Sequence, residues 1–396
     1  MKIHRAWLAL SLGVAAAAVA CGSAFDATNG FESSADGGAR SSSGGSSSSG
    51  SSPDPAGASP QLANAVILVH AASFPPFRVC FGNMPDEQPT PNRDLMPSSN
   101  VVGVEVGAAV RLPPLPGGGT KGTLGTVRIY QEADIRGLYA NGANGPDCKS
   151  LIEANPGLGL EIKPIEASVA NGVHVLALTG CRSAAIDPAA SKSRCGDTWT
   201  ADKGNLVLQQ IPLQPFGNPG ASSLPMRALL LSSSIAANAQ GKNVGISFGT
   251  VGTFANTVPS PFTDRLALAE LSAPTTINFL RDDPAVYEKQ GFALSYGTAS
   301  DGGVVDAGAD ASTPRQLVAK QSLAEVQNLS EPTAVPEDWY APGRAGFVLL
   351  VLGDPDPRLP NGSSDPDPTH APHLLALPLE SVQDSGDAGT VTEAGP

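Results

Sequence analysis

Short apolar runs, separated by glycine and proline, are the feature that most limits how this chain can fold. Representative runs cover residues 65–71, 77–82, 125–130 and 173–180, and turn-forming residues bound each of them. Runs of this length between turns are typical of β-strands. The 44 glycines and 36 prolines make up a fifth of the 396 residues, which implies many turns. We therefore expect an all-β fold with few short helices, built as a β-sandwich that is either Ig-like or a partly open barrel.

The order of the apolar runs is repeated in the second half of the chain. Residues 66–71, 78–82, 174–180 and 206–213 have counterparts at residues 227–232, 244–249, 347–353 and 374–379. From Val66 to Leu206 is 140 positions, and from Leu229 to Leu374 is 145, so the spacing agrees. Four landmarks in one order indicate a tandem duplication, and the alternative is coincidence among apolar strands. We expect two tandem β-sandwich modules at residues 61–214 and 225–380, joined by a proline-rich hinge at residues 212–225.

Few segments favour a helix. Asp147 is positioned to cap a helical turn over residues 148–152. Residues 315–329 have apolar residues at helical spacing, which predicts one amphipathic helix in the second module. The preceding residues 298–314 are low in complexity and rich in glycine and aspartate, so we expect a disordered loop there.

Residues 1–20 have the pattern of an exported leader. Lys2, His4 and Arg5 precede an uncharged run at residues 7–19, which is shorter than the roughly 20 apolar residues of a spanning helix. This pattern predicts a signal peptide. Residues 18–22, Ala-Val-Ala-Cys-Gly, resemble the lipobox of bacterial lipoproteins, although leucine is more usual at the position of Ala18.

The lipobox resemblance implies a lipid anchor. It implies removal of residues 1–20, attachment of a diacylglycerol to the Cys21 thiol, and acylation, for example with palmitate, of the new amino terminus. Several acyl chains would anchor the protein to a membrane without spanning it. Gly22 rather than aspartate after the cysteine favours the outer membrane of a Gram-negative bacterium, with the periplasmic or surface face left open. The alternative is an ordinary signal peptide followed by an unmodified Cys21.

Two segments have almost no apolar residues to bury. Residues 21–60 are rich in serine and glycine, and residues 381–396 are acidic. Such segments cannot offset the entropy cost of ordering, so we expect a disordered tether and a disordered tail. A Gly/Ser coil of about 40 residues spans on the order of 35 Å.

The other four cysteines predict disulfides. Cys80, Cys148, Cys181 and Cys195 remain after Cys21, and an even number in an exported protein indicates two bonds. Cys181 and Cys195 flank a short loop, so a bond between them would close a ring of roughly 15 residues. Cys80 would then pair with Cys148, although the other two pairings stay open.

The charge of the chain limits its partners. The net charge is −13 and the isoelectric point is about 4.8, which makes nucleic acid and anionic lipid surfaces unfavourable partners. Membrane attachment is therefore expected only through the lipid on Cys21.

The opening of the first module resembles a known type of domain. Residues 65–72, the prolines at 75 and 76, and residues 77–80 are similar to an uncharacterised exported β-domain of bacteria, which opens with V-R-V-x-H-A-S-P-D-A-P-x-V-D-V. Members are often tandem lipoproteins. The resemblance implies an extracytoplasmic β-sandwich of unknown function. The charged D-A-P core is missing here, and the second module has Ser232 where the first has His70.

One motif suggests a serine hydrolase. Residues 245–249, Gly-Ile-Ser-Phe-Gly, match the G-x-S-x-G nucleophile elbow, in which a strand, a strained turn and a helix expose the serine. No helix start follows, and the repeat aligns Ser247 with Cys80 inside a strand. We therefore expect Ser247 to be structural, with Asp354 and His370 as its potential partners in the alternative case.

Other polar clusters could bind metal. Carboxylates at Asp354, Asp356, Asp365 and Asp367 lie near His370 and His373 in sequence, and such groups suit Ca²⁺ or a first-row metal. The proline-rich spacing favours a solvated Asp-Pro turn instead.

Two further sets of candidate ligands favour the same structural interpretation. The aspartates 301, 306 and 310 lack the repeat of calcium-binding β-rolls. His70 and His174 lie on predicted strands, where a buried structural histidine is the expected role. We expect neither a metal nor a cofactor.

The expected function is non-enzymatic. The sequence favours an envelope lipoprotein that presents two β-modules on a flexible stalk for binding an envelope or extracellular ligand, either protein or glycan. The alternative is a lipid-anchored hydrolase that uses Ser247 or a metal at His370 and His373.

Overall fold

The computed structural model describes the following parts of the chain: residues 65–81, 103–112, 123–139, 148–155, 157–168, 172–187, 190–216, 224–254, 258–259, 261–277, 285–297, 315–328, 340, 346–357, 364–365, 367 and 370–379. The predicted leader (1–20), tether (21–60), loop (298–314) and tail (381–396) lie outside these residues. Among the described residues, no helix is long and apolar enough to cross a membrane.

The fold is all-β with few short helices, and its first half, module 1, contains two sheets. One sheet has the order β3-β1-β6-β7 and the other β2-β4-β5. The strands are β1 (Ala65–His70), β2 (Phe77–Phe81), β3 (Ala109–Arg111), β4 (Thr123–Gln131), β5 (Leu160–Ser168), β6 (Val173–Thr179) and β7 (Val207–Leu213). The helices are α1 (Glu132–Ile135), η1 (Arg136–Tyr139), α2 (Cys148–Ala154) and α3 (Lys192–Cys195). The helix expected after Asp147 is therefore confirmed as α2.

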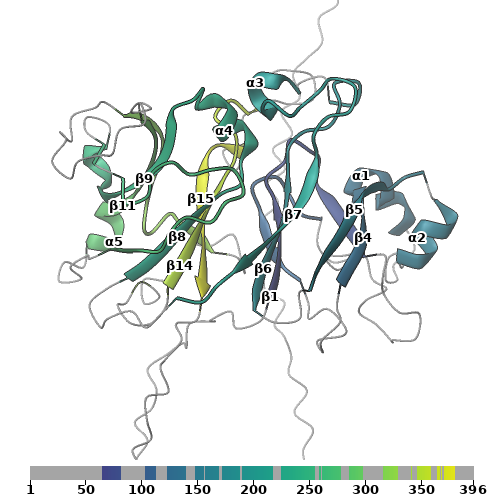
Figure 1. The fold of residues 1–396 in the computed structure, drawn as a ribbon, viewed down its shortest axis with the longest axis horizontal. Helices are drawn as coiled ribbons and strands as arrows, with labels where there is room; N and C mark the ends of the chain where they lie inside the picture. The colour runs from purple at the N-terminus through teal and green to yellow at the C-terminus, as the bar shows by residue number, and fades with distance from the viewer. Residues whose placement is uncertain are drawn as a thin grey trace, which may run out of the picture. The chain divides into compact units, whose positions relative to one another are not determined.

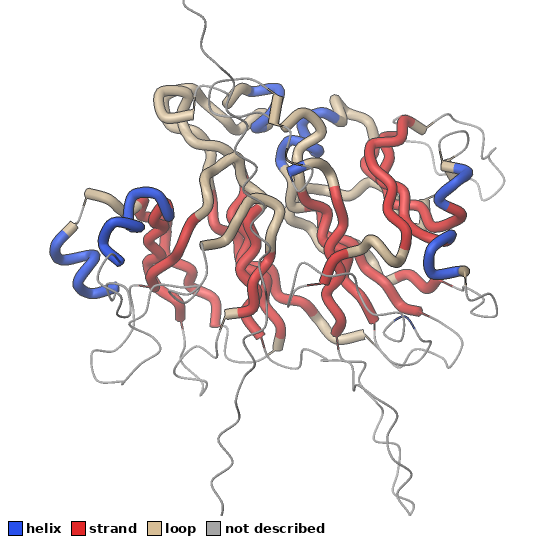
Figure 2. Tube along the Cα trace, turned by 180° about the vertical axis from the view of Figure 1, so that it is seen from behind, coloured by secondary structure: helices blue, strands red, loops and turns tan. Residues whose placement is uncertain are grey.

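The second half, module 2, also contains two sheets. Their orders are β10-β8-β14-β15-β13 and β12-β11-β9. The strands are β8 (Leu224–Leu230), β9 (Asn243–Thr250), β10 (Thr275–Ile277), β11 (Gln290–Gly297), β12 (Gln316–Ser322), β13 (Gln327–Asn328), β14 (Gly346–Leu352) and β15 (His373–Leu379). The helices are α4 (Ser233–Asn238), η2 (Val251–Thr253) and α5 (Val286–Lys289). Figure 2 shows these short helices beside the strand layers rather than between them.

The two modules share one topology. In each, two central strands pair in parallel, β1 with β6 and β8 with β14, and antiparallel strands flank them, β3 and β7 or β10 and β15. The three-stranded sheets also agree, because β4 and β11 are each the middle strand of an antiparallel sheet. The apolar runs that repeat in the sequence correspond to β1 and β8, β2 and β9, β6 and β14, and β7 and β15.

Four layers of strands make up the described part of the chain (Figure 1). The three-stranded sheets are the outer layers, and the sheets around β1/β6 and β8/β14 are the inner layers. Neighbouring side chains of a strand point to opposite faces. In β1, Val66 and Leu68 pack inside module 1, whereas Ile67 and Val69 pack against module 2. The strands β6, β8, β14 and β15 divide their side chains in the same way.

This arrangement explains why the inner strands are buried along their whole length and are mostly apolar. Both faces of β1, β6 and β14 are covered, so every residue in them is buried. Strands buried on both faces are typically continuous apolar runs, whereas half-exposed strands alternate. The apolar layer between the modules also means that they are not two separate sandwiches on a hinge. Pro212 lies in β7 and Pro225 in β8, and both strands contribute to this shared core.

The amphipathic helix predicted for residues 315–329 is wrong. Residues 316–322 form β12, which pairs antiparallel with β11, and residues 327–328 form β13 beside β15. Helix propensity contributes only tenths of a kcal/mol per residue, so pairing with a free strand edge decides the conformation. The edge of β11 that faces away from β9 has backbone N–H and C=O groups that need partners, and β12 supplies them.

Candidate functional site

The central parallel strands of both modules end on the same side of the molecule. A contact at their ends joins the modules: the His373 Nε2 atom at the start of β15 lies 2.9 Å from the Gly107 carbonyl oxygen. The Gly107 N–H in turn donates to the carbonyl of His70, the last residue of β1. In open sheets of parallel strands, ligands bind beyond the carboxyl ends of the strands. The loops that follow β1, β6, β8 and β14 are therefore the first place to look for a site.

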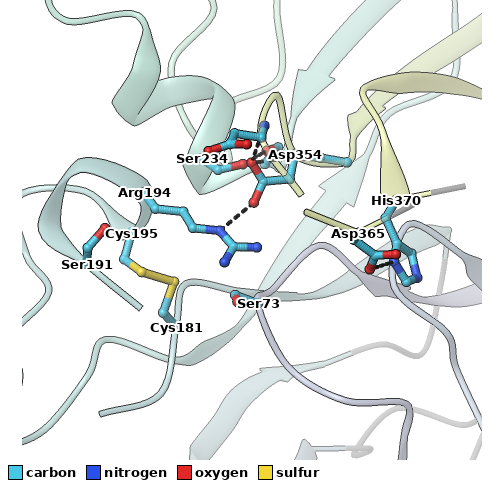
Figure 3. A network of polar contacts seen from close by, with 12 residues as sticks. Ser73, Cys181, Ser191, Arg194, Cys195, Ser234, Asp354, Asp365 and His370 are labelled. Atoms are coloured by element: carbon cyan, nitrogen blue, oxygen red, sulfur yellow. Dashed lines mark hydrogen bonds and ion pairs between the residues drawn. A yellow bond between two sulfur atoms is a disulfide. The ribbon is translucent and has the colours of Figure 1, made fainter. Parts of the chain in front are cut away.

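An ion pair between the modules lies at this end (Figure 3). The Arg194 Nε atom of α3 donates to the Asp354 carboxylate, which follows β14, over 2.5 Å. The side chains are 14% and 12% exposed, so solvent screens this pair little. The other Asp354 oxygen accepts the Asp356 N–H at 2.9 Å. Arg194 Nη1 is buried without a hydrogen-bond partner among the described residues.

Serines that follow β8 attach helix α4 to the end of β14. The Ser232 hydroxyl lies 2.5 Å from the Gly353 carbonyl oxygen and accepts the Ile235 N–H at 3.1 Å, which caps α4. From the other side, the Tyr296 hydroxyl donates to the Ile235 carbonyl at 3.1 Å. Burial raises the pKa of Tyr296 to about 12, so this donor keeps its proton. Helix α4 is therefore held at both its first turn and its flank.

The structure contains two disulfides, Cys80–Cys148 and Cys181–Cys195. The second closes the loop that carries Arg194, and Asn205 braces it: its Oδ1 accepts the Cys181 N–H and its Nδ2 donates to the Cys195 carbonyl, both at 2.9 Å. Gly180, just before this loop, has a φ of +85°, and a Cβ atom there would lie 2.4 Å from the Asn205 carbonyl oxygen. The loop is thus fixed covalently and by hydrogen bonds.

A cleft of about 730 Å³ lies between this loop and α4. We call it the inter-module cleft. One wall is the end of the disulfide loop, residues 192–198, and the other is the α4 region, residues 233–241. Its floor includes Thr179 at the end of β6, with Val207 and Gln209 of β7. The Gln209 Oε1 atom is buried and has no hydrogen-bond partner among the described residues. A buried carbonyl oxygen of this kind is a good acceptor for a ligand donor.

Ser247 does not have the geometry of a nucleophile elbow. It lies inside β9, is completely buried, and donates its hydroxyl to the Pro259 carbonyl at 2.7 Å. The strand runs on to Thr250 and continues into the short 3₁₀ helix η2, so no α-helix follows the serine. A nucleophile needs an exposed hydroxyl at a strand-to-helix turn.

The carboxylate and histidine cluster does not form a metal centre in the part of the chain that the structure describes. The Asp367 N–H donates to Asp365, whose carboxylate also lies 2.6 Å from His370 Nδ1, and these two contacts lower the pKa of Asp365. Both ring nitrogens of His373 face carbonyl oxygens, those of Ala371 and Gly107. Among the described residues, no three His, Cys, Asp or Glu side chains could hold a metal together. The aspartates at 301, 306 and 310 lie outside those residues.

His70 and His174 are buried and are not brought together. The register of β1 and β6 places His174 opposite Val66, four residues from His70, which is about 13 Å along a strand. Burial lowers the pKa of His70 to about 4, partly offset by its 2.9 Å contact with the Val104 carbonyl. Gly180 follows β6 and Gly353 follows β14, both with a positive φ. His70 pairs with the residue two positions before Gly180, and Leu230 pairs with the residue two positions before Gly353. Leu230 therefore occupies the position of His70 in module 2, and the alignment of His70 with Ser232 is wrong.

Sequence reasoning missed the residues that build the cleft. Arg194 and Gln209 were not singled out, and Ser232, which caps α4, was noted only for its alignment with His70. Two signals could have found them. Gln209 and Gln210 interrupt an otherwise apolar strand, and the serines at 232–234 directly follow one. Polar residues at such positions are expected to have partners or ligands.

The disulfides indicate where the protein works. Disulfides form and persist in oxidising compartments, so the described fold is that of an extracytoplasmic protein. Cys21 lies outside the described residues. A scan against protein-family models and a search of curated proteins found no match to this chain.

Proposed function

We propose that this chain is a lipoprotein of the bacterial cell envelope that binds an envelope or extracellular ligand without catalysing a reaction. Lipid on Cys21 anchors it to the outer membrane of a Gram-negative bacterium, residues 22–60 serve as a stalk, and the two modules bind the ligand. The observation that carries the proposal is the pair of disulfides, because an oxidised fold agrees with the exported leader.

The packing of the modules and the charge of the chain support the binding of a ligand other than nucleic acid. Apolar residues of both modules pack in the layer between them, and a preorganised scaffold favours affinity because little entropy is lost on binding. The net charge of −13 disfavours nucleic acid. The inter-module cleft, of about 730 Å³, is lined by residues of both modules, so a ligand there could contact both.

The anchor is tested by replacing Cys21. In the native bacterium or a Gram-negative host, the full-length protein is expected in the membrane fraction and should incorporate labelled palmitate. The Cys21→Ser variant should lose the label and appear in the soluble periplasmic fraction or the medium, because several acyl chains are the only expected attachment. Membrane association of Cys21→Ser without any label would contradict the proposal.

A matched control uses a cysteine that the fold already employs. The pair Cys181→Ser/Cys195→Ser removes two thiols elsewhere and should leave palmitate incorporation unchanged. Loss of label in that variant would show that export or folding, rather than the lipid site, had been disturbed.

A further inference from the structure

We propose that the inter-module cleft is a binding site for a neutral oligosaccharide. This inference rests on the proposed binding function and specifies the class of ligand. It follows from the size of the cleft, the chemistry of its lining and one buried acceptor on its floor.

The size of the cleft suits a small ligand. Ligand pockets in proteins usually have volumes of about 300–1,000 Å³, and this cleft has about 730 Å³. Both walls are held in place before any ligand binds: the disulfide and Asn205 fix one, and Ser232 and Tyr296 fix the other. Such preorganisation reduces the cost of binding.

The lining favours an uncharged ligand with many hydroxyl groups. Thr179 and Gln209 of module 1 and Ser233 and Gln240 of module 2 present hydroxyl and amide groups. The charged residues of the described lining are Lys192 and Asp197, and their side chains lie 3.3 Å apart. The two charges cancel, so neither an anion nor a cation gains a net attraction there.

Gln209 supplies the most specific requirement. Its buried Oε1 atom has no hydrogen-bond partner among the described residues, and a buried acceptor left unpaired costs free energy. A ligand hydroxyl donating to this oxygen would remove that cost. Because β7 alternates, Gln209 points toward the cleft, whereas Gln210 points to the opposite face and contacts His174 at 3.2 Å.

The rim of the cleft adds apolar contacts that suit a sugar ring. Val207 and Leu268 line the cleft and are 39% and 40% exposed. A pyranose has hydroxyl groups at its edge and an apolar C–H face, so it can use the amides and these side chains together. An extended peptide would instead need a row of unpaired backbone groups, and the polar groups identified here belong to side chains.

Binding is tested with the full-length protein in a detergent that has no sugar headgroup. The probes are panels of neutral oligosaccharides, including chitotetraose and maltotetraose, a sulfated tetrasaccharide, and an uncharged tetrapeptide. We expect calorimetry or ligand-observed NMR to detect at least one neutral oligosaccharide and neither of the other probes. Binding of only the sulfated probe or only the peptide, or no binding at all, would overturn the proposal.

Two variants locate the site. Gln209→Leu should weaken binding at least tenfold, because it removes the acceptor for a sugar hydroxyl. Leu268→Ala should weaken binding several-fold, because it removes an apolar contact with the sugar ring. Leu268 is exposed, so its truncation should leave the fold intact. Gln210→Leu is the matched control on the same strand and should bind as the unmodified protein does. Equal affinity in Gln209→Leu and Gln210→Leu would place the sugar elsewhere and refute the cleft.

The outcome is separable from that of the anchor. Lipidation at Cys21 without sugar binding would refute the cleft proposal and leave the lipoprotein proposal standing. Sugar binding that depends on Gln209 in a protein that incorporates no lipid would do the reverse.

Discussion

The two modules have the same strand order, but different interactions stabilise them. On the outer face of β2, Arg78 pairs with Glu132 at 2.5 Å, with both side chains buried, and Cys80 is bonded to Cys148. On the corresponding face of β9, Gly245 and Ser247 take these places, and a loop covers them. The Ser247 hydroxyl bonds to that loop at Pro259.

The difference shows how one topology can be stabilised in two ways. The helices α1 and α2 cover the outer sheet of module 1, but the apolar cluster beneath them has only five buried residues, two of which are the bonded cysteines. Between their two sheets the modules are alike, because each has a large apolar core with aromatic pairs, such as Phe74 with Phe77 in module 1 and Phe248 with Phe292 in module 2. The difference lies in what covers the outer sheet. Where the apolar area is small, a covalent bond supplies the missing stability.

Removing the module 1 disulfide should destabilise the protein most. The Cys80→Ala/Cys148→Ala variant should lose about 4 kcal/mol of unfolding free energy, because the bond closes a long loop, with 68 positions between its cysteines. The Cys181–Cys195 bond has a sequence separation of only 14, so the Cys181→Ala/Cys195→Ala variant should lose less, about 3 kcal/mol. Urea unfolding followed by circular dichroism measures both.

The two disulfide variants also test whether the modules unfold together. Because they share an apolar layer, both variants should show one transition. A separate early transition in the Cys80→Ala/Cys148→Ala variant would mean that module 1 unfolds alone. A loss of unfolding free energy below about 1 kcal/mol in that variant would mean that α1 and α2 stay in place without the disulfide.

The fold was largely predictable from the inner strands. Strands such as β1 and β14 are apolar at nearly every position because both faces are buried, and this makes them visible in the sequence. The same feature concealed the layer between the modules, since a continuous apolar run does not say what covers its second face. The weakly apolar residues of β12 were misassigned because pairing with β11, rather than local pattern, decides their conformation.

The second prediction concerns a histidine that only module 1 has at this position. The pKa of His70 is lowered to about 4 by burial, against an ordinary 6.5, so the unfolded chain binds the additional proton between these values. The contribution of neutral His70 to the unfolding free energy should be fully present above about pH 6.5, and the unfolding free energy should fall by about 3 kcal/mol as the pH drops to about 4. The His70→Leu variant copies Leu230 of module 2 and should lose this part of the pH dependence. Urea midpoints at pH 7 and pH 4.5 measure the difference.

A suitable control for the pH experiment is His174. It lies on the neighbouring strand, so His174→Leu should retain the slope that His70 causes. If His70→Leu keeps the full dependence between pH 6.5 and pH 4, another group is responsible and the burial of His70 does not govern it.

The candidate site was much less predictable than the fold. The lining of the inter-module cleft comes from β6, β7, the disulfide loop and α4, which are distant in sequence. Arg194 and Asp354 are 160 positions apart, and only the packing of one inner sheet on the other brings them together. Sequence patterns report the local period of a strand, but they do not report which loops meet.

Removing the ion pair between the modules should destabilise the protein least. Asp354→Asn keeps the side-chain shape but removes its charge, so Arg194 would stay mostly buried without a counter-ion. We expect a loss of about 2 kcal/mol, typical of a hydrogen bond to a charged group, and faster tryptic cleavage at Lys192 in the loosened loop. Asp356→Asn, an exposed change two residues away, should alter stability by less than about 0.5 kcal/mol. If Asp354→Asn matches that control in both measurements, the ion pair does not hold the modules together and serves only to orient the disulfide loop along the cleft.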